Sequence, residues 1–258
     1  MSKDYIQFIS RINRKLGIDL SLYKEAQMKR RITSLRNKRG YTDFVSFYRA
    51  LEEDETLLEE FTKRLTINVS EFYRNPKRWE VLEKEIIPRL IAKKNKLTIW
   101  SAACSTGEEP YSISMLLSET FPDIQATIIA TDIDEFVLKQ AKQGVYQEQS
   151  LKNISPYLKK KYFTHENNLY YINKSVKNTI TFKKHNLLAD HYPENIDLLI
   201  CRNVLIYFTD QAKEIIYQKF SSSLNEQGIL FVGSTEQIFN SDRYNLKLFD
   251  TFFYEKNS

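Results

Sequence analysis

Two acidic residues stand at the start of a predicted helix within residues 99–117, IWSAACSTGEEPYSISMLL. An apolar pair leads into six small residues, 101–106, and a single glycine precedes Glu108 and Glu109. This order predicts a strand, a tight turn and a helix start, the arrangement that binds nucleotides in α/β proteins. Carboxylates in the first helical turn would repel a pyrophosphate, so the turn favours a ligand that is neutral or cationic there. In the alternative interpretation, the acids only complement the helix dipole, at about 0.3–1 kcal/mol each.

Asp132 closes the next apolar strand, within QATIIATDID, 25 residues after Gly107. An acid at this place accepts hydrogen bonds from the ribose hydroxyls of a nucleoside. Asp134 is expected to cap the helix that starts at Glu135 and to leave Asp132 for the ribose, although the reverse assignment stays open. A ribose-binding acid beside a turn unsuited to phosphate fits S-adenosylmethionine, which carries a sulfonium and an ammonium group but no phosphate.

Strands and helices alternate from residue 97 onward, and this alternation predicts a mostly parallel, doubly wound α/β sheet. The carboxyl ends of four consecutive strands carry polar residues that a core does not need. Residues 144–186 break the alternation with two short strand-like runs, NLYYINK and NTITFKK, which indicate a small antiparallel insertion. The predicted strands are 97–100, 125–134, 179–182, 196–203, 228–234 and one or two within 244–256.

The first quarter of the chain has a helical pattern and a different charge. Residues 1–50 hold twelve Lys/Arg and four Asp/Glu, a net charge of +8, and the other 208 residues sum to −3. This imbalance suggests an acidic partner for the helical part. The predicted domains are a helical domain at 1–67, a connector with a helix at 68–90, and an α/β domain at 91–258 with an insertion at about 145–185.

Composition narrows the function classes. No apolar run is long enough to span a membrane, no signal sequence is evident, and two cysteines cannot form a disulfide framework, so we expect a cytoplasmic protein without membrane insertion. Neither cysteine has a partner at metal-ligand spacing, which predicts no metal site. The three histidines, in or beside the insertion, are expected to pack or face solvent rather than to catalyse.

Five motifs together resemble one protein family. These motifs, which are similar to those of the chemoreceptor glutamate methyltransferases of bacterial chemotaxis, the CheR family, are SAACSTGEEPYS, TINVSEFYR, ATDID, NLL and CRNVLIYF. The resemblance covers nearly the whole chain. The resemblance implies a Rossmann-like S-adenosylmethionine-dependent methyltransferase sheet with a small antiparallel subdomain and an all-α N-terminal domain. It also implies that receptor glutamates become γ-methyl esters.

The resemblance assigns roles to individual residues. Arg74 or Arg202 would hold one oxygen of the acceptor carboxylate, and Tyr207 would orient the other. Such an acceptor, with a pKa of about 4.3, is ionised at neutral pH and needs no general base. The residues expected to bind the cofactor are Asn68, Ser70, Arg74, Ala102, Glu108, Asp132, Asn186, Leu187, Arg202 and Asn203.

Recognition of the receptor is expected to involve the basic segment KEAQMKRRITSLRNKR at 24–39. With the resemblance, its cations favour docking on the acidic methylation helices of a receptor coiled coil. The insertion segment FTHENNLYYINK has no glycine where some family members have a Gly-rich turn, so we expect no need for a C-terminal receptor peptide as a tether. The cations expected to face the receptor are Lys29, Arg30, Arg36 and Arg39.

Two other functions compete with this hypothesis. The protein could bind the cofactor and dock on receptors without transferring a methyl group, although Arg74, Arg202 and Tyr207 argue against this. It could also be an RNA methyltransferase that uses the basic helix. Against that, no aromatic residues are interleaved with the charges, and the strand end reads CRNV rather than the Asn/Asp-Pro-Pro-Tyr/Phe typical of nucleic-acid amino-methylating enzymes. A monomer is expected by analogy.

Overall fold

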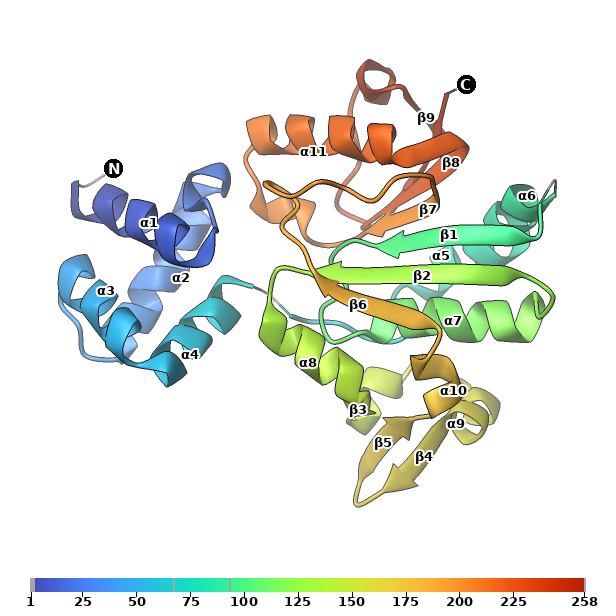
Figure 1. Cartoon of the computed structure of the whole chain (residues 1–258), viewed down its shortest axis with the longest axis horizontal. Helices are drawn as coiled ribbons and strands as arrows, with labels where there is room; N and C mark the ends of the chain where they lie inside the picture. The colour runs from blue at the N-terminus through green and yellow to red at the C-terminus, as the bar shows by residue number, and fades with distance from the viewer. Residues whose placement is uncertain (1–2, 67, 93, 258) are drawn as a thin grey trace. The chain divides into compact units, whose positions relative to one another are not determined.

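The computed structural model describes residues 3–66, 68–92 and 94–257. It divides into two compact units, and each is described by itself (Figure 1). The helical unit comprises Met1–Asn68 together with Leu205–Ile216. The sheet unit comprises Val69–Val204 and Tyr217–Ser258.

The helical unit is built from four helices and a short 3₁₀ turn. Apolar residues at three- and four-residue spacing bury one face of each helix, and Phe8 stacks on Phe47 with ring centroids 5.9 Å apart. Asp19 caps the 3₁₀ turn, and the α-helix that follows starts at Glu25. The elements are α1 Lys3–Leu16, η1 Leu20–Leu22, α2 Glu25–Lys38, α3 Phe44–Glu53 and α4 Glu55–Leu65.

A segment from far along the sequence packs within this helical unit. It holds the 3₁₀ turn η4 (Leu205–Tyr207) and the first part of α11 (Asp210–Ser223). Phe208 forms an isolated β-bridge with Tyr23, and the centroids of the two rings lie 4.8 Å apart. The backbone N–H of Lys24 donates to the carbonyl of Tyr207 at 2.8 Å. Residues that follow the CRNV motif are thereby fixed against the start of α2.

The sheet unit contains the predicted doubly wound sheet. Its strand order is β6-β2-β1-β7-β8-β10-β9. The first five strands are parallel, and β10 pairs antiparallel with both β8 and β9. All six residues of β7 are buried, as expected for a central strand covered on both faces. The strands are β1 Lys96–Ser101, β2 Gln125–Asp132, β6 Ile180–Lys184, β7 Ile196–Cys201, β8 Leu224–Val232, β9 Leu246–Asp250 and β10 Phe253–Lys256.

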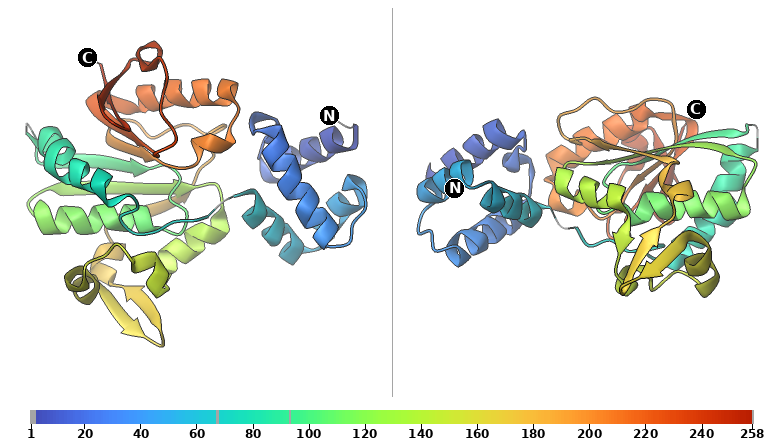
Figure 2. Two further views of the ribbon diagram at one scale, coloured as in Figure 1. Left: turned by 180° about the vertical axis from the view of Figure 1, so that it is seen from behind. Right: turned by 60° about the horizontal axis from the view of Figure 1, so that its bottom comes forward.

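Helices cover this sheet and position its strand ends. α7 (Glu108–Thr120) and α8 (Glu135–Gln143) pack against β2 and β6 (Figure 2). The connector leads into α5 (Pro76–Val81), a π-helical turn η2 (Leu82–Ile86) and α6 (Ile87–Ile91), which packs against β1. The helix predicted within the connector region at 68–90 is therefore present, with a π-helical turn in its middle.

The insertion is a separate three-stranded antiparallel sheet of order β3-β5-β4. Asn167 and Asn168 make the β4–β5 turn with φ of +50° and +61°, the conformation that glycine usually supplies in a two-residue hairpin. The run NTITFKK does not belong to this sheet, because it forms β6 and pairs in parallel with β2. The elements here are β3 Val145–Tyr146, η3 Glu148–Leu151, α9 Pro156–Tyr162, β4 Phe163–Glu166, β5 Leu169–Ile172 and α10 Lys174–Lys177.

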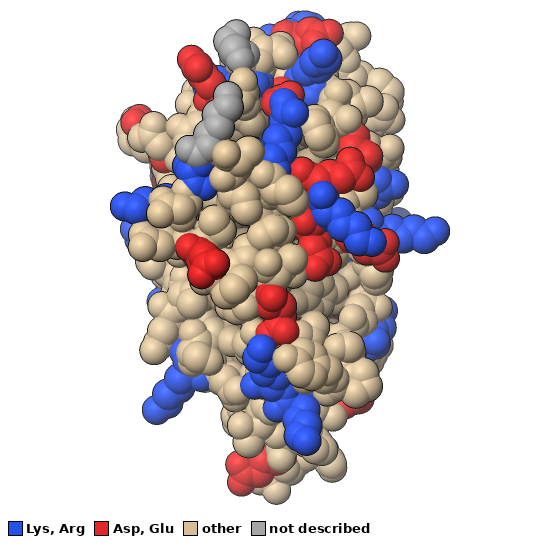
Figure 3. All heavy atoms as spheres, turned by 90° about the vertical axis from the view of Figure 1, so that its right-hand side faces the viewer, with Lys and Arg blue, Asp and Glu red and all other residues tan. Residues whose placement is uncertain are grey.

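The side from which the parallel strands β1 and β2 start carries no patch of a single charge sign. Basic and acidic side chains alternate over the face shown in Figure 3. Among the described helices, none is long and apolar enough to cross a membrane. The polar residues that the sequence analysis singled out lie at the opposite edge of the sheet, where the parallel strands end.

Candidate functional site

The turn between β1 and α7 is fastened to both neighbouring strands. The N–H of Ala102 donates to a carbonyl of β7 at 2.8 Å, and the N–H of Cys104 donates to a carbonyl of β2 at 2.9 Å. Gly107 has φ of +94°, and a Cβ there would lie 3.0 Å from the Cβ of Ala141. Glycine is required at this position both by the backbone conformation and by the close packing of α8.

Asp132, at the end of β2, is buried beside this turn. Its Oδ2 accepts from the N–H of Ser105 at 2.9 Å, and its Oδ1 accepts from the N–H of Asp134 at 3.0 Å. Burial raises the pKa of Asp132 to about 6. Asp134 accepts from the N–H of Phe136 and caps α8, which confirms its predicted role. Asp132 is thus left at the strand end with lone pairs that a ribose could engage.

The two glutamates of the opening motif have different surroundings. Glu108 is 3% exposed and accepts from the hydroxyl of Thr106 at 2.7 Å. Burial raises the pKa of Glu108, while hydrogen bonds from Thr106 and Ser70 oppose that rise. Glu109 accepts from the hydroxyl of Ser101 at 2.8 Å and forms an ion pair with Arg202. Glu108 is therefore the acid that remains for a cationic ligand, and Glu109 serves the protein's own arginine.

Arg202, just after β7, is buried and holds the connector. Its Nη2 donates to the carbonyl of Arg74 at 2.9 Å and to Oδ1 of Asn75 at 2.8 Å. Its Nη1 lies 3.5 Å from Oε2 of Glu109, and its guanidinium lies 4.6 Å from the ring centroid of Phe231. One side chain thereby joins the end of β7, the first turn of α7 and the connector.

The connector, residues 69–75, is held in an uncommon backbone conformation. Tyr73 and Asn75 have φ of +49° and +62°. The N–H of Tyr73 donates to the hydroxyl of Ser112 at 3.0 Å, and the indole of Trp79 donates to the carbonyl of Arg74 at 2.9 Å. The guanidinium of Arg74 donates to the carbonyl of Val69 within the connector at 3.2 Å and is half-buried. The main chain of Arg74 is thus fixed, while its side chain donates a hydrogen bond within the connector itself.

The remaining predicted cofactor residues fall at two places. Asn186 follows β6, and its Oδ1 accepts from the N–H of Leu188 at 2.9 Å. The next residue, Leu187, is buried. Asn203 follows β7 with φ of +61°. Asn68 lies in the helical unit, where its side chain donates to the hydroxyl of Thr66. The predicted residues that belong to the sheet unit are Ser70, Arg74, Ala102, Glu108, Asp132, Asn186, Leu187, Arg202 and Asn203.

Tyr207 belongs to the helical unit, and the guanidinium carbon of Arg31 from α2 lies 4.9 Å from its ring centroid. The sequence did not single out Arg31. Its signal is only the basic run in which it stands, and its contact with Tyr207 spans 176 positions of the sequence.

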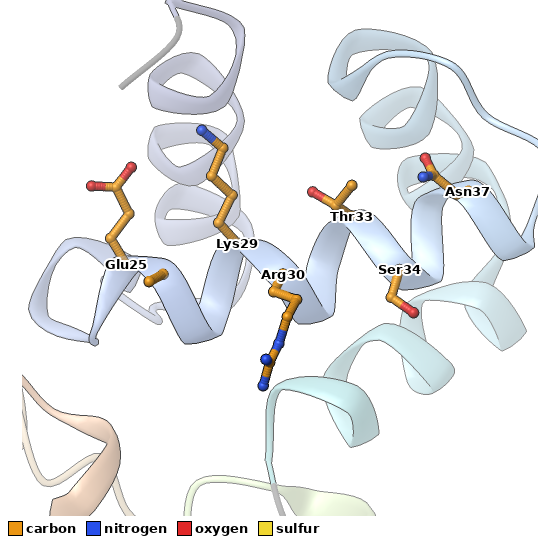
Figure 4. Close-up of a pocket in the computed structure, with 7 residues that line it drawn as sticks. Glu25, Lys29, Arg30, Thr33, Ser34 and Asn37 are labelled. Carbon is orange, nitrogen blue, oxygen red and sulfur yellow. The ribbon is translucent and has the colours of Figure 1, made fainter.

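The four cations predicted to face a receptor have different local contacts. Lys29 lies over the ring of Tyr5, and Arg36 lies over the ring of Phe44. Arg39 forms an ion pair with Glu60. In Figure 4, Lys29 and Arg30 point to opposite sides of α2, and Arg30 is exposed. The basic charge is therefore spread around the helix rather than gathered on a single face.

The residues at the strand ends fit S-adenosylmethionine. Two buried polar atoms, Oγ of Ser105 and Nε of Arg202, have no protein hydrogen-bond partner among the described residues. Asp132 can accept from ribose hydroxyls, and Glu108 offers a negative charge to a sulfonium or ammonium group. The same two carboxylates oppose a phosphate.

Comparison with protein families identifies the family of the chain. Residues 3–66 match the family described as CheR methyltransferase, all-alpha domain, and residues 68–252 match CheR methyltransferase, SAM binding domain. The chain belongs to the CheR methyltransferase family. It is therefore a methyltransferase, and S-adenosylmethionine is its cofactor, which confirms the resemblance and the predicted fold.

Three relatives match nearly the whole chain. A chemotaxis protein methyltransferase of Listeria monocytogenes is 44% identical over 257 residues, which cover 99% of this chain and 98% of the relative. A protein of the same name from Borreliella burgdorferi is 32% identical and covers 100% of this chain and 95% of the relative. The one from Escherichia coli is 33% identical and covers 90% of this chain and 83% of the relative.

The raised pKa of Asp132 predicts a pH dependence of cofactor binding. The folded-state pKa of about 6 lies above the unfolded value of about 3.9. The free energy of unfolding of the unliganded protein therefore falls as the pH rises from about 4 to about 6 and Asp132 ionises. The ionised form is the one that accepts from both ribose hydroxyls. We expect the Kd for S-adenosylhomocysteine, measured by calorimetry, to be about tenfold higher at about pH 5 than at about pH 7.

Asp132→Asn is the matched control for this dependence. It cannot ionise, so its weaker binding should vary by less than about threefold over the same range. An equal pH dependence in the variant would assign the titration to another group, and a flat response of the unmodified protein would contradict a ribose role for Asp132.

Proposed function

We propose that the protein methylates glutamate side-chain carboxylates of bacterial chemoreceptors and produces γ-glutamyl methyl esters. The observation that carries this proposal is the full-length match, through both domains, to relatives named chemotaxis protein methyltransferase. A carboxylate oxygen attacks the methyl carbon, the bond from that carbon to sulfur breaks, and S-adenosylhomocysteine leaves as a neutral thioether. No proton is transferred in this step.

The surroundings of the site suit an acceptor that is already ionised. A glutamate with a pKa of about 4.3 needs no general base at neutral pH. The site acids are engaged elsewhere: Glu109 pairs with Arg202, and Asp132 accepts from two backbone N–H groups. What the protein must supply is the alignment of the carboxylate with the methyl–sulfur bond and the removal of water.

Of the two arginines that could hold the acceptor, the contacts favour Arg74. The guanidinium of Arg202 is buried, and both of its terminal nitrogens already face Glu109, the Arg74 carbonyl and Asn75. Arg74 is half-buried, and its guanidinium donates to a carbonyl of its own connector. We therefore propose that Arg74 binds the acceptor carboxylate and that Arg202 positions the connector. For Tyr207, in the helical unit, we propose the role that the family resemblance implies, to orient an acceptor oxygen.

The helical unit is the proposed receptor-recognition part. Its cations on α2 and the net charge of +8 over residues 1–50 suit the acidic helices of a receptor. We also propose that the enzyme is monomeric and cytoplasmic. The cations proposed to bind the receptor are Lys29, Arg30, Arg36 and Arg39. Among the residues that the structure describes, no contact favours the RNA methyltransferase or the non-catalytic docking module over it.

Transfer of labelled methyl from S-adenosylmethionine to a receptor cytoplasmic fragment tests the proposal. The product is treated with mild base, because carboxyl methyl esters then release volatile methanol while N-methyl groups stay bound. We expect volatile label. Base-stable label on RNA would favour the RNA methyltransferase, and no label despite cofactor binding would favour the docking module.

The assignment of Arg74 makes a separate prediction. Arg74→Lys keeps the charge but loses the planar, two-point contact with a carboxylate. We expect kcat for receptor methylation to fall by about 100-fold or more while the carbonyl that Arg202 holds stays in place. Activity within about threefold of the unmodified enzyme would exclude Arg74 as the acceptor-binding arginine.

The insertion makes a prediction about tethering. Its β4–β5 turn consists of two asparagines without glycine, unlike the Gly-rich turn that the family resemblance associates with peptide binding. We propose that methylation does not need a C-terminal receptor peptide. Fluorescence anisotropy with a labelled peptide of that kind is expected to show no binding at micromolar concentrations, and measurable micromolar affinity would contradict the proposal.

A further inference from the structure

A buried glutamate outside the predicted site holds two strand ends together. Glu236, in the turn that follows β8, is 4% exposed. Its Oε2 accepts from the N–H of Asn203 at 2.6 Å and from the N–H of Gly233 at 2.9 Å. Its own N–H donates to the carbonyl of Gly233 at 3.0 Å. A single carboxylate oxygen therefore bridges the residue after β8 to the segment after β7.

Gly233 is shaped to admit this carboxylate. A Cβ at Gly233 would lie 2.4 Å from Oε2 of Glu236 and 2.8 Å from the nitrogen of Asn203. The φ angle of Gly233 is not positive, so glycine is needed here for the space that its missing side chain leaves and not for backbone freedom. The carboxylate of Glu236 can therefore lie in this turn only because residue 233 is a glycine.

The group that Glu236 holds is a strained part of the cofactor site. Asn203 has φ of +61°, a left-handed conformation that non-glycine residues adopt at a cost. A charge-assisted hydrogen bond to its N–H can compensate that cost. Asn203 directly follows Arg202, whose guanidinium holds the connector. The backbone conformation of Asn203 therefore helps to determine the directions in which the side chains of Arg202 and Asn203 point from the end of β7.

The charges around Arg202 are consistent with such a role. Glu109 and Glu236 both favour its charged form, and burial opposes it. Glu236 also contributes to raising the pKa of Glu109. One buried cation is thus accompanied by two buried acids, which suits a ligand that carries a sulfonium.

We propose that Glu236 is a positioning residue of the cofactor site, which holds Asn203 and Arg202 in place through hydrogen bonds from its carboxylate to the N–H groups of Asn203 and Gly233. It does not touch the cofactor itself. The inference depends on the S-adenosylmethionine site and not on the identity of the acceptor that is methylated.

Calorimetric titration of the full-length protein with S-adenosylhomocysteine tests this role. Glu236→Ala leaves two buried N–H groups unpaired, so its affinity should fall by about tenfold to 100-fold. Glu236→Gln keeps an oxygen that can accept both bonds and should stay within about threefold of the unmodified protein. The measurement is made well below the thermal unfolding midpoint of each variant.

Asp197→Ala is the matched control. Asp197 is also 4% exposed, lies on β7 away from its carboxyl end, and accepts from the N–H of Thr98 at 2.9 Å and from the side chain of Asn225. This variant should lower the unfolding midpoint but leave the affinity for S-adenosylhomocysteine unchanged. A general loss of stability would instead affect both variants alike.

Three results would overturn the proposal. Glu236→Ala could bind S-adenosylhomocysteine as tightly as the unmodified protein, or it could lose no more affinity than Asp197→Ala. Glu236→Gln could bind as weakly as Glu236→Ala, which would assign the effect to charge rather than to hydrogen bonding. If Glu236→Ala does not fold, Glu236→Asp takes its place. Its shorter side chain cannot hold both N–H groups in the same geometry, so it should weaken binding while Glu236→Gln does not.

Discussion

The guanidinium of Arg202 connects the parts of the sheet unit that must lie together around a cofactor. It leaves the end of β7, pairs with Glu109 in the first turn of α7, and donates to the backbone and side chain of the connector. Removing a charge from water costs several kcal/mol, about what a well-placed partner and hydrogen bonds return. Such a group adds little net stability, but it penalises any arrangement in which its partners are displaced. The position of the connector follows from that penalty.

This constraint explains the unusual acidic turn. One of its two glutamates, Glu109, pairs with Arg202, and the other, Glu108, accepts a hydrogen bond from Thr106 and is the acid proposed to face the cofactor. Burial raises the pKa values of both carboxyl groups. Strained backbone gathers around the same place, at Tyr73, Asn75, Ser105 and Asn203. Strain of this kind persists where surrounding contacts over-determine it, as at ligand sites.

Local sequence signals predicted much of this arrangement. The strand ends, the cap at Asp134 and the glycine of the cofactor turn follow from residues close in sequence, because alternation, capping and turn geometry act over a few positions. The run NTITFKK suited either sheet, and only its pairing with β2 resolves it. Contacts between distant segments were not predictable in this way. The bonds of Glu236 to Asn203 and the packing of Tyr207 beneath Arg31 depend on the assembled fold.

The account depends most directly on the claim that Arg202 fixes the connector. Hydrogen–deuterium exchange of the full-length Arg202→Lys variant, compared with the unmodified protein, measures this in the peptide that covers residues 69–77. The account predicts much faster exchange there, because the bonds to the Arg74 carbonyl and to Asn75 are lost, with unchanged protection in β7 and β8. Unchanged exchange of the connector would contradict it and would leave the position of Arg74 without its proposed cause.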